Sequence, residues 1–216
     1  MGGLDKLFTE VAGRPLLAHA TAPFQECSTI DRIVLVLSEE NVERAEKLAR
    51  EHALSKVTAV VPGGARRQDS VRFGVEALGP SDFVAVHDGA RPLVDTRLIA
   101  RGLEAVRETG AAVPAVPLVD TVKEVGPGAI VERTVDRTRM WAVQTPQFFR
   151  YDLLLRAHRE HPVAVTDDAA MLEAMGVPVK IFPGDRRNIK VTTPEDLELV
   201  QAMMQMKMSH ADHGQD

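Results

Sequence analysis

The sequence predicts an α/β fold with a Rossmann-like, mostly parallel sheet, helices on both faces and a protruding β-hairpin arm. Three observations support this prediction. Short apolar runs typical of buried parallel strands alternate with amphipathic stretches of helical length. Residues that favour helix starts and ends stand at the junctions between them. The alternation then gives way to a β-rich stretch around the turn-forming residues 126–128.

The first half of the chain holds the alternating units. We expect a continuous apolar strand over residues 32–37, with Ser38 as the N-cap of a helix that runs to about residue 52. Strands at 57–61, 83–86 and 112–116 follow, separated by helices over 68–78 and from Asp95 to Gly110. Strands that alternate with helices of this length indicate right-handed βαβ units and a parallel sheet.

The second half begins with the arm, residues 119–137. Two β-rich segments, 119–125 and 129–135, flank a tight turn and predict a hairpin. Such a hairpin has too little apolar surface to fold alone, so we expect it to pack on something else, such as a second subunit.

The rest of the chain returns to the body, and residues 1–216 are expected to form a single domain. The remaining predicted elements are helices at 151–158 and 168–175, a strand at 179–182, an Ile189–Val191 stretch of strand character, and a helix that begins at Thr193 and Pro194. The polar tail from residue 209 is expected to fray.

Composition excludes several classes of protein. The chain has 216 residues, 44% of them apolar, and its longest apolar runs are too short to span a membrane. Its first residues lack the apolar core of a signal peptide. The lone Cys27 excludes a disulfide framework and a cysteine zinc site, and favours a reducing, cytoplasmic location. A formal charge of −5 argues against non-specific nucleic-acid binding.

Polar loops follow the predicted strands, where ligands of open α/β sheets bind. In the first loop, Gly63 and Gly64 would let the backbone approach a ligand, although the pair taken alone favours a flexible turn with solvated arginines. In the next, Asp88 suits Mg²⁺ or a ribose hydroxyl and Arg91 suits a phosphate; the alternative is a structural ion pair.

Three further candidate site residues each have a simple structural explanation when they are considered one at a time. Arg137 stands at the foot of the arm, where an arginine is usually just solvated. Lys190 lies between two apolar residues, as an outward-facing edge-strand lysine would. Thr166 precedes a helix that it or Asp167 would cap. The sequence has neither a G-x-S-x-G nucleophile motif nor a G-x-G-x-x-G loop after a strand, and its histidines lack metal-ligand spacing.

Taken together, the loops resemble the family of 2-C-methyl-D-erythritol 4-phosphate cytidylyltransferases. The resemblance covers nearly the whole chain through short motifs in the same order. Those motifs are Lys6 in 4–8, residues 13–17, Gly63-Gly64 with Arg67 and 69–71, residues 86–92, 120–123, 135–137, 144–148, 166–169, 188–192 and 194–197. Each motif is modest alone, and their shared order makes chance an unattractive explanation.

This resemblance implies transfer of CMP from CTP to methylerythritol phosphate, with Mg²⁺ and release of pyrophosphate. Lys6 and Lys190 would contact the reacting phosphates. The cytidine side would be lined by Gly64, Ser70, Gly89 and Arg91, and Asp88 would serve the ribose or the Mg²⁺. Arg137 and Thr166 would bind methylerythritol phosphate. The arm would cross to the other subunit of a homodimer, so that Arg137 acts in the partner's site.

The start of the chain departs from the family pattern. There, an apolar strand and a glycine-rich phosphate loop precede the position of Lys6, whereas five residues precede it here. From this difference we expect roughly 15 to 25 further residues ahead of Met1. The apolar strand at 32–37 supports the expectation, because a strand apolar on both faces needs neighbours.

Two other functions fit part of the pattern. One is a cytidylyltransferase for another polyol phosphate, such as ribitol 5-phosphate, whose core motifs would look nearly the same. The other is a non-catalytic dimeric nucleotide-binding module. The presence of both Lys6 and Lys190 speaks against the second alternative, because binding alone does not require the pair.

Overall fold

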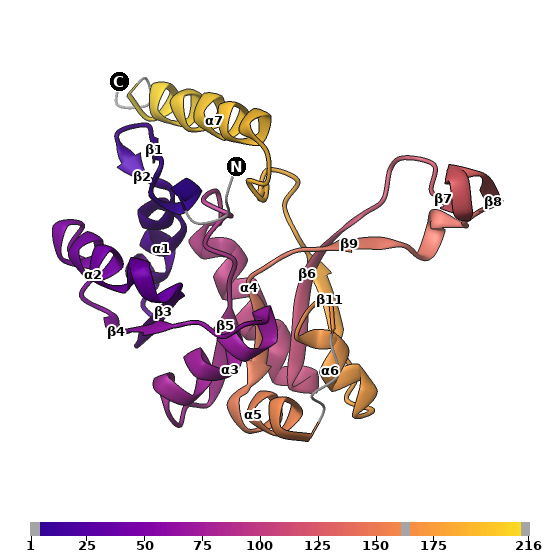
Figure 1. Ribbon diagram of the computed structural model, residues 1–216, viewed down its shortest axis with the longest axis horizontal. Coiled ribbons are helices and arrows are strands. Elements are labelled where there is room, and N and C mark those ends of the chain that lie inside the picture. Colours follow the sequence, from indigo (N-terminus) through magenta and orange to yellow (C-terminus); the bar gives the residue numbers. More distant parts are fainter. Residues whose placement is uncertain (1–4, 161–164, 213–216) are drawn as a thin grey trace.

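The computed structural model describes residues 5–160 and 165–212 as a layered body with one long extension (Figure 1). Its strands form two main sheets. The larger has five strands in the order β11-β6-β10-β5, with β9 beside β6, and the smaller is the pair β3-β4. Their bounds are β3 Ile33–Leu37, β4 Val57–Pro62, β5 Phe83–Val86, β6 Ala111–Pro117, β9 Trp141–Val143, β10 Gln147–Arg150 and β11 Lys180–Pro183.

The α/β prediction is confirmed, and the strand directions refine it. β3 pairs with β4 in parallel, and so does β6 with β11. β10, however, lies antiparallel between β5 and β6, and β9 is antiparallel to β6. Sequence analysis expected neither β9 nor β10. The side chains of Phe148 and Phe149 are fully buried, which explains why such a short segment occupies the middle of the sheet.

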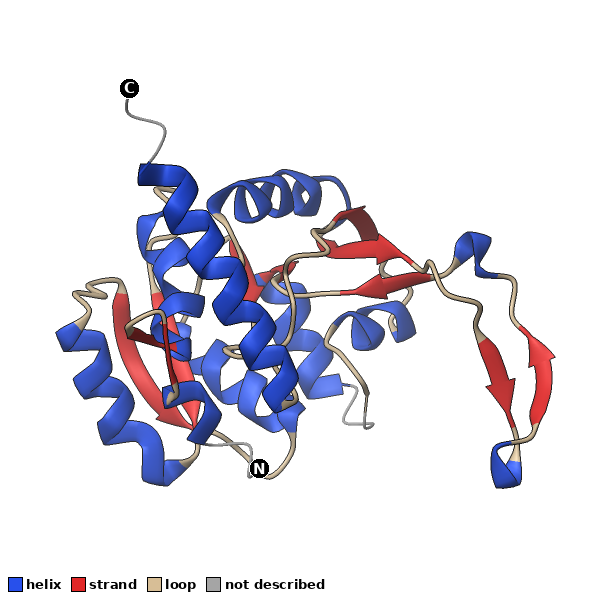
Figure 2. Cartoon of the chain, turned by 90° about the horizontal axis from the view of Figure 1, so that it is seen from above, coloured by secondary structure: helices blue, strands red, loops and turns tan. Residues whose placement is uncertain are grey.

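Helices cover both faces of the larger sheet (Figure 2). Phe24 of α1 and Ile99 of α4 share one core cluster with Phe148, whereas Val75 of α3 and Leu154 of α5 share another with Phe149. The helices are α1 Leu16–Glu26, α2 Val42–Glu51, α3 Arg67–Leu78, α4 Thr96–Thr109, α5 Tyr151–Glu160, α6 Ala169–Ala174 and α7 Pro194–Asp212. Within residues 5–160 and 165–212, none of them has the length and hydropathy needed to cross a membrane.

Several predicted helix ends are confirmed. Asp95 accepts a hydrogen bond from the Leu98 backbone at 2.8 Å, and Gly110 ends α4 in the left-handed conformation at φ 81°. Thr193 accepts one from the Asp196 backbone at 3.3 Å. The Ser38 prediction is wrong: its side chain caps no helix, and a short 3₁₀ helix, η2 Glu39–Asn41, precedes α2.

The arm projects away from the body (Figures 1 and 2). It contains β7 Lys123–Val125 and β8 Val131–Thr134, joined by the 3₁₀ turn η3 Pro127–Ala129. Its strands are therefore shorter than expected, and the connection is wider than a tight hairpin turn. All residues of both strands are exposed. The apolar side chains among them have no core beneath them.

Candidate active site

Asp88 stands at the centre of a charged cluster just beyond β5. Its carboxylate oxygen Oδ2 lies 3.0 Å from Lys190 Nζ and 3.5 Å from Arg91 Nε. The Asp88 side chain is 17% exposed, whereas that of Lys190 is 44% exposed and open to solvent. The cluster thus offers one solvent-facing cation anchored on a carboxylate that is mostly buried.

The pKa of Asp88 lies below its ordinary value. Burial is the largest single influence and would raise it, but the charge and hydrogen bond of Lys190 together with the charges of Arg67 and Arg91 outweigh burial. The carboxylate is therefore ionised at neutral pH, as a ligand for a cation or a hydroxyl group must be.

Lys6 and Lys190 meet at the same loop although they are far apart in sequence. Lys6, in the 3₁₀ helix η1 Asp5–Phe8, donates from Nζ to the Val191 carbonyl at 3.1 Å. The Val191 backbone in turn donates to Ala90 at 2.8 Å, next to the Asp88 loop. Lys190 lies in this loop and not in a strand, which corrects the sequence prediction. The two lysines and the loop after β5 form one site.

A chain of hydrogen bonds fixes the backbone beneath Asp88. Thr145 Oγ1 accepts from the Asp88 backbone at 3.0 Å and lies 3.1 Å from His87 Nδ1, while His87 Nε2 lies 3.1 Å from the Arg91 carbonyl. Because a carbonyl only accepts, Nε2 donates, and Nδ1 of the neutral ring accepts from Thr145. Removal of the ring from water lowers the pKa of His87 to about 4, which keeps this neutral form at pH 7.

The lysine loop is tied down in the same way. Arg91 Nη1 donates to the Asn188 carbonyl at 2.7 Å, and the buried Asn188 side chain donates from Nδ2 to the Thr145 carbonyl at 2.8 Å. The side chain of Lys190 therefore projects from a loop whose backbone is held by two contacts of Asn188, one with Arg91 and one with Thr145.

The glycines of the loop after β4 are required for space. A Cβ on Gly63 would lie 2.7 Å from Ser70 Oγ, and one on Gly64 would lie 2.4 Å from Asp69 Cβ. The Gly64 backbone donates to Ser70 Oγ at 3.0 Å, which folds the loop onto the first turn of α3. Gly89 has slightly more space, because its Cβ would lie 3.2 Å from Cδ1 of the Leu17 side chain. The backbone at these glycines is therefore closely packed against neighbouring residues.

An ion pair that sequence analysis gave no role joins two of the loops. Arg67 Nη1, at the start of α3, lies 2.9 Å from Oδ2 of the fully buried Asp168, and His158 Nε2 lies 3.6 Å from Oδ1. Burial raises the pKa of Asp168, against the opposing charge of Arg67. Both residues occur in the motifs noted above, but more than one hundred positions separate them, so no local pattern reveals that they meet.

The structure does not bring all predicted residues together. Lys6, Lys190, Asp88, Gly89 and Arg91 form one cluster. Arg67, which follows the glycines at the start of α3, acts on Asp88 through its charge and pairs with Asp168. Thr166 is exposed, beside Asp167, whose Oδ1 accepts from the Ala170 backbone of α6 at 3.1 Å. Asp167 therefore bonds the first turn of α6, whose N-cap position is Asp168.

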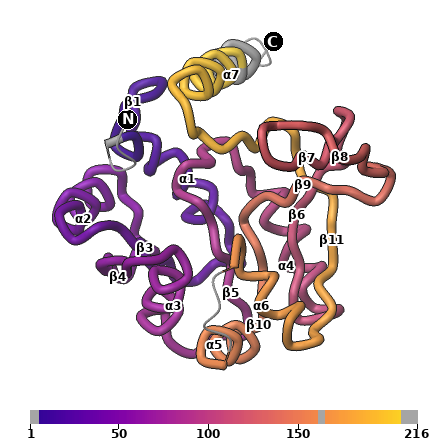
Figure 3. Tube along the Cα trace, turned by 45° about the vertical axis from the view of Figure 1, so that its right-hand side comes forward, coloured from indigo at the N-terminus to yellow at the C-terminus, as the bar shows by residue number. Residues whose placement is uncertain are grey.

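Arg137 lies apart from the others. It is in the 3₁₀ helix η4 Arg137–Arg139 and is exposed, and the arm that carries it leaves the body after β6 and returns to it at β9 (Figures 1 and 3).

The donor set around Asp88 fits one kind of metal ion. No group of three or more histidine, cysteine or acidic side chains that could hold a metal occurs within residues 5–160 and 165–212. A single ionised carboxylate is nevertheless what Mg²⁺ commonly uses when substrate phosphates supply its other ligands. The residues present therefore fit a Mg²⁺ ion that arrives with a nucleotide.

Comparisons with known proteins agree with this chemistry. A profile of the family described as 2-C-methyl-D-erythritol 4-phosphate cytidylyltransferase matches residues 1–206. A protein of that name from Dehalococcoides mccartyi (strain ATCC BAA-2266 / KCTC 15142 / 195) is 48% identical over 204 residues, which are 94% of this chain and 90% of the relative. The crystal structure of a Thermus thermophilus protein of that name has a TM-score of 0.80 at 36% identity, covering 93% of this chain and 94% of the other.

Proposed function

The chain belongs to the 2-C-methyl-D-erythritol 4-phosphate cytidylyltransferase family and transfers CMP from CTP in isoprenoid precursor synthesis, and we propose that the Asp88–Lys190 cluster is its active site. The observation that carries this proposal is the meeting of Lys6 and Lys190, from opposite ends of the chain, on one loop beside an ionised carboxylate. Two cations around one carboxylate suit a reaction between anions.

The reaction joins two repelling phosphates. A phosphate oxygen of 2-C-methyl-D-erythritol 4-phosphate attacks the α-phosphorus of CTP, a new P–O bond forms, and the bond to the β-phosphate oxygen breaks to release pyrophosphate. A phosphate dianion is already a nucleophile, so no strong base is needed. Lys6 and Lys190 hold the two reactants together and neutralise the negative charge that grows on the reacting phosphate.

Asp88 and its loop orient the nucleotide. Asp88 binds a ribose hydroxyl or holds Mg²⁺, which, when bound, neutralises the departing pyrophosphate. Gly64, Ser70 and Gly89 provide a close-packed backbone surface for the cytosine ring, and Arg91 keeps Asp88 in position. These assignments give a use to the short distances from Asp88 to Lys190 and Arg91 and to the close packing of the backbone at Gly64.

The second substrate is bound by Thr166 and, from another copy of the chain, by Arg137. Support comes from the arm, in which Val119, Val125, Ile130 and Val131 are 56%, 55%, 70% and 52% exposed. A row of exposed apolar side chains on a projecting hairpin is typical of an interface. We infer a homodimer in which each arm reaches the partner's site. The buried, unpaired Cys27 is compatible with a cytoplasmic location, which we also infer.

Pyrophosphate release tests the function. The protein is incubated with Mg²⁺, CTP and either 2-C-methyl-D-erythritol 4-phosphate or ribitol 5-phosphate, and CTP is replaced by ATP or UTP in parallel. We expect release with CTP and the methylerythritol compound, and at least about tenfold less with each substitute, because pocket contacts made to one substrate are lost with another. A faster reaction with ribitol 5-phosphate would assign the enzyme to a different polyol phosphate. Turnover that persists in excess chelator would remove Mg²⁺ from the proposal.

A further inference from the structure

We propose that Gln147 is a positioning residue for the second substrate. Its side chain holds Asp167 in place and thereby presents the neighbouring Thr166 to 2-C-methyl-D-erythritol 4-phosphate. The role rests on the proposed function, in which Thr166 binds that substrate.

Gln147 is a polar side chain in the interior of the larger sheet. It begins β10 and pairs with Val86 of β5. The residue is 1% exposed, although glutamine is mostly found at protein surfaces. Because burial of an amide is costly unless the amide is hydrogen-bonded, this side chain requires a partner.

The partner of Gln147 is Asp167. Gln147 Nε2 donates to Asp167 Oδ2 at 2.8 Å, and the Ala170 backbone of α6 donates to Oδ1 at 3.1 Å. Both carboxylate oxygens are therefore held, one from the sheet and one from the helix. Gln147 Oε1 is buried and has no hydrogen-bond partner in the described parts of the chain. The amide thus serves as a donor, and its NH₂ group faces Asp167 because two oxygens would repel each other.

Side-chain contacts also fix the segment that carries Thr166. Residues 165–168 lie in neither a helix nor a strand. Thr166 is exposed and is followed by Asp167, which is held by β10, and by the fully buried Asp168, which lies 2.9 Å from Arg67. The backbone beside the Thr166 hydroxyl is thus held from two other elements, while the hydroxyl itself is open to a ligand.

The hydrogen bond also determines where the negative charge of Asp167 lies. A carboxylate one residue away from an anion-binding hydroxyl would repel a phosphate dianion if it turned toward it. With both oxygens engaged, the Asp167 carboxylate is directed at β10 and α6 instead. We expect loss of the Gln147 donor to release this carboxylate and to weaken binding of the substrate that carries the phosphate.

The residues just before Gln147 bond the other two loops of the candidate site. Gln144 Nε2 donates to the Asp185 carbonyl at 2.8 Å, and the Asp185 backbone donates to Gln144 Oε1 at 3.2 Å, in the lysine loop. Thr145 Oγ1 accepts from the backbone of the loop after β5. Residues 144–147 therefore hold the lysine loop, the loop after β5 and, through Gln147, the segment of the second substrate.

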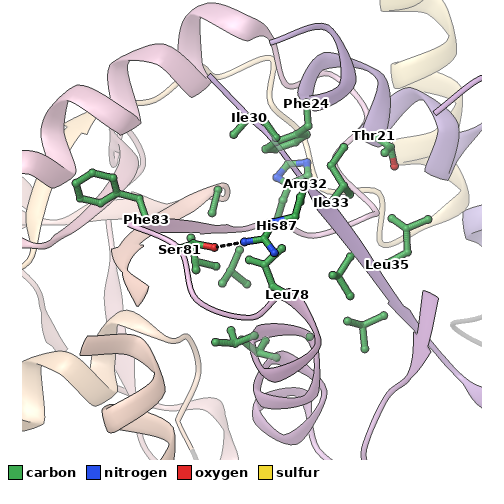
Figure 4. Close-up of a pocket in the computed structure, with 18 of the residues that line it drawn as sticks. Thr21, Phe24, Ile30, Arg32, Ile33, Leu35, Leu78, Ser81, Phe83 and His87 are labelled. Carbon is green, nitrogen blue, oxygen red and sulfur yellow. Dashed lines mark hydrogen bonds between the residues drawn. The ribbon is translucent and has the colours of Figure 1, made fainter. Parts of the chain in front are cut away.

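This run of residues is itself anchored in the body. Thr145 contacts His87, whose ring lies against Phe24 of α1 with the ring centroids 5.0 Å apart. Both rings line the cavity drawn in Figure 4. Gln144 and Thr145 are buried. Because the run is buried and packed, a donor at the start of β10 has a fixed position from which to hold an irregular segment.

Reversal of the hydrogen bond tests this role. In Gln147→Glu the donor is lost and a carboxylate faces that of Asp167. In the double variant Gln147→Glu with Asp167→Asn, the amide introduced at position 167 donates to the carboxylate introduced at position 147. The bond is then restored in the opposite direction, and the net charge is that of the unmodified enzyme. Pyrophosphate release gives KM for each substrate, and thermal unfolding gives the stability of each variant.

Two further variants complete the set. Gln147→Leu removes the donor without adding a charge, and it supplies the same comparison of KM values if Gln147→Glu does not fold. Gln25→Leu is the matched control, because the Gln25 amide also joins two segments, bonding Ser55 Oγ at 3.0 Å and the Lys56 backbone at 2.8 Å ahead of β4. The control should lower the melting temperature and leave both KM values unchanged.

We expect each single substitution of Gln147 to raise KM for 2-C-methyl-D-erythritol 4-phosphate by about tenfold or more, because a hydrogen bond to a charged group is lost. KM for CTP should change by less than about twofold. The double variant should return to within about threefold of the unmodified enzyme. An unchanged KM for the methylerythritol compound, or equal changes in both KM values, would overturn the role of Gln147. A double variant as impaired as Gln147→Glu would also overturn it.

The unmodified enzyme separates this role from the proposed function. If it releases pyrophosphate from CTP with the methylerythritol compound and the Gln147 variants show no difference between the two KM values, the role of Gln147 alone is wrong. If the unmodified enzyme has no such activity, both the proposed function and the role of Gln147 are wrong.

Discussion

The carboxyl edge of the sheet and the arm hold their charged residues under opposite physical conditions. At the carboxyl edge, Asp88 is mostly buried and is contacted by Lys190 and Arg91. In the arm, Arg133 pairs with Glu124 through side chains that are 69% and 47% exposed, and Arg137 is exposed. Buried pairs hold their geometry because water competes poorly for them, whereas exposed pairs are screened and contribute little.

This difference indicates which part of the candidate site a single chain can position by itself. Lys190 and Lys6, which we propose bind the phosphates, are already positioned by contacts to Asp88 and Val191. Arg137 has no comparable support from the described parts of the body, so its position must come from whatever surface the arm meets. Substitutions in the two regions should therefore have different effects: those at the carboxyl edge should lower activity or stability within one chain, and those in the arm should act through its contact surface.

Replacing Lys190 with alanine should have the largest effect. Loss of a cation that stabilises the transition state should lower turnover by about 10²-fold or more, about 2.7 kcal/mol, without unfolding the chain. Lys180→Ala is the matched control, because Lys180 of β11 pairs with Glu108 away from the cluster. Steady-state pyrophosphate release measures both variants. A rate for Lys190→Ala within about threefold of the unmodified enzyme would remove Lys190 from the mechanism.

Mixing two inactive variants should restore part of the activity. If Arg137 acts in the partner's site, an Arg137→Ala chain and a Lys190→Ala chain form a mixed dimer in which one site keeps both residues. An equal mixture with free exchange should recover up to roughly a quarter of the normal rate. Native mass spectrometry establishes that mixed dimers have formed. Background activity in their presence would mean that Arg137 works within its own chain or not at all.

The free energy of unfolding should fall as the solution is acidified from pH 6.5 to 4. The pKa of His87 is lowered from 6.5 to about 4, so in this window the unfolded chain binds a proton that the folded chain does not. The stability is fully present above pH 6.5 and is lost as pH falls, by up to about 3 kcal/mol from this residue. Urea unfolding at several pH values measures it, with His87→Gln as the comparison. A variant with the same pH dependence as the parent would contradict the role of His87.

The smallest expected effect is on the free energy of unfolding, when one ion pair in the body and one in the arm are removed. Asp168→Asn should destabilise the body by about 1–3 kcal/mol, because Arg67 loses a buried partner while remaining partly solvated. Arg133→Ala in the arm should change stability by less than about 0.5 kcal/mol, because both side chains are in water. Chemical unfolding at pH 7 compares them directly. Equal effects would mean that burial does not distinguish the two regions.

Sequence reasoning predicted elements whose signals are local. The caps at Asp95 and Thr193 and the glycine stop at Gly110 depend on neighbouring residues, and the structure shows each of them. α1 was not predicted, because its sequence is apolar on several sides and contains Pro23, which obscures the helical period. β10 has only four residues, too few to show a strand period.

For the candidate site too, the sequence predicted residue types but not the contacts between distant segments. The residue types at Asp88, Arg91 and Lys190 were predicted from motifs, but the distances between them depend on tertiary structure. The Arg67–Asp168 pair and the Thr145–His87 contact connect segments that are remote in sequence, so their partners emerge only when the chain folds. The positions of Thr166 and Arg137 relative to the lysines stay predictions.

The contact between Lys190 and Asp88 has a consequence for the order of events at the site. An anion that draws the Lys190 ammonium away would leave Oδ2 of Asp88 with only the more distant Arg91 as a counter-charge. That oxygen then favours a new positive or hydrogen-donating group, so uptake of the anion and of its companion are thermodynamically linked, each tightening the other. We therefore expect the Lys190–Asp88 contact to break when substrate binds, with the anion bound by Lys190 and a cation or hydroxyl group bound by Asp88.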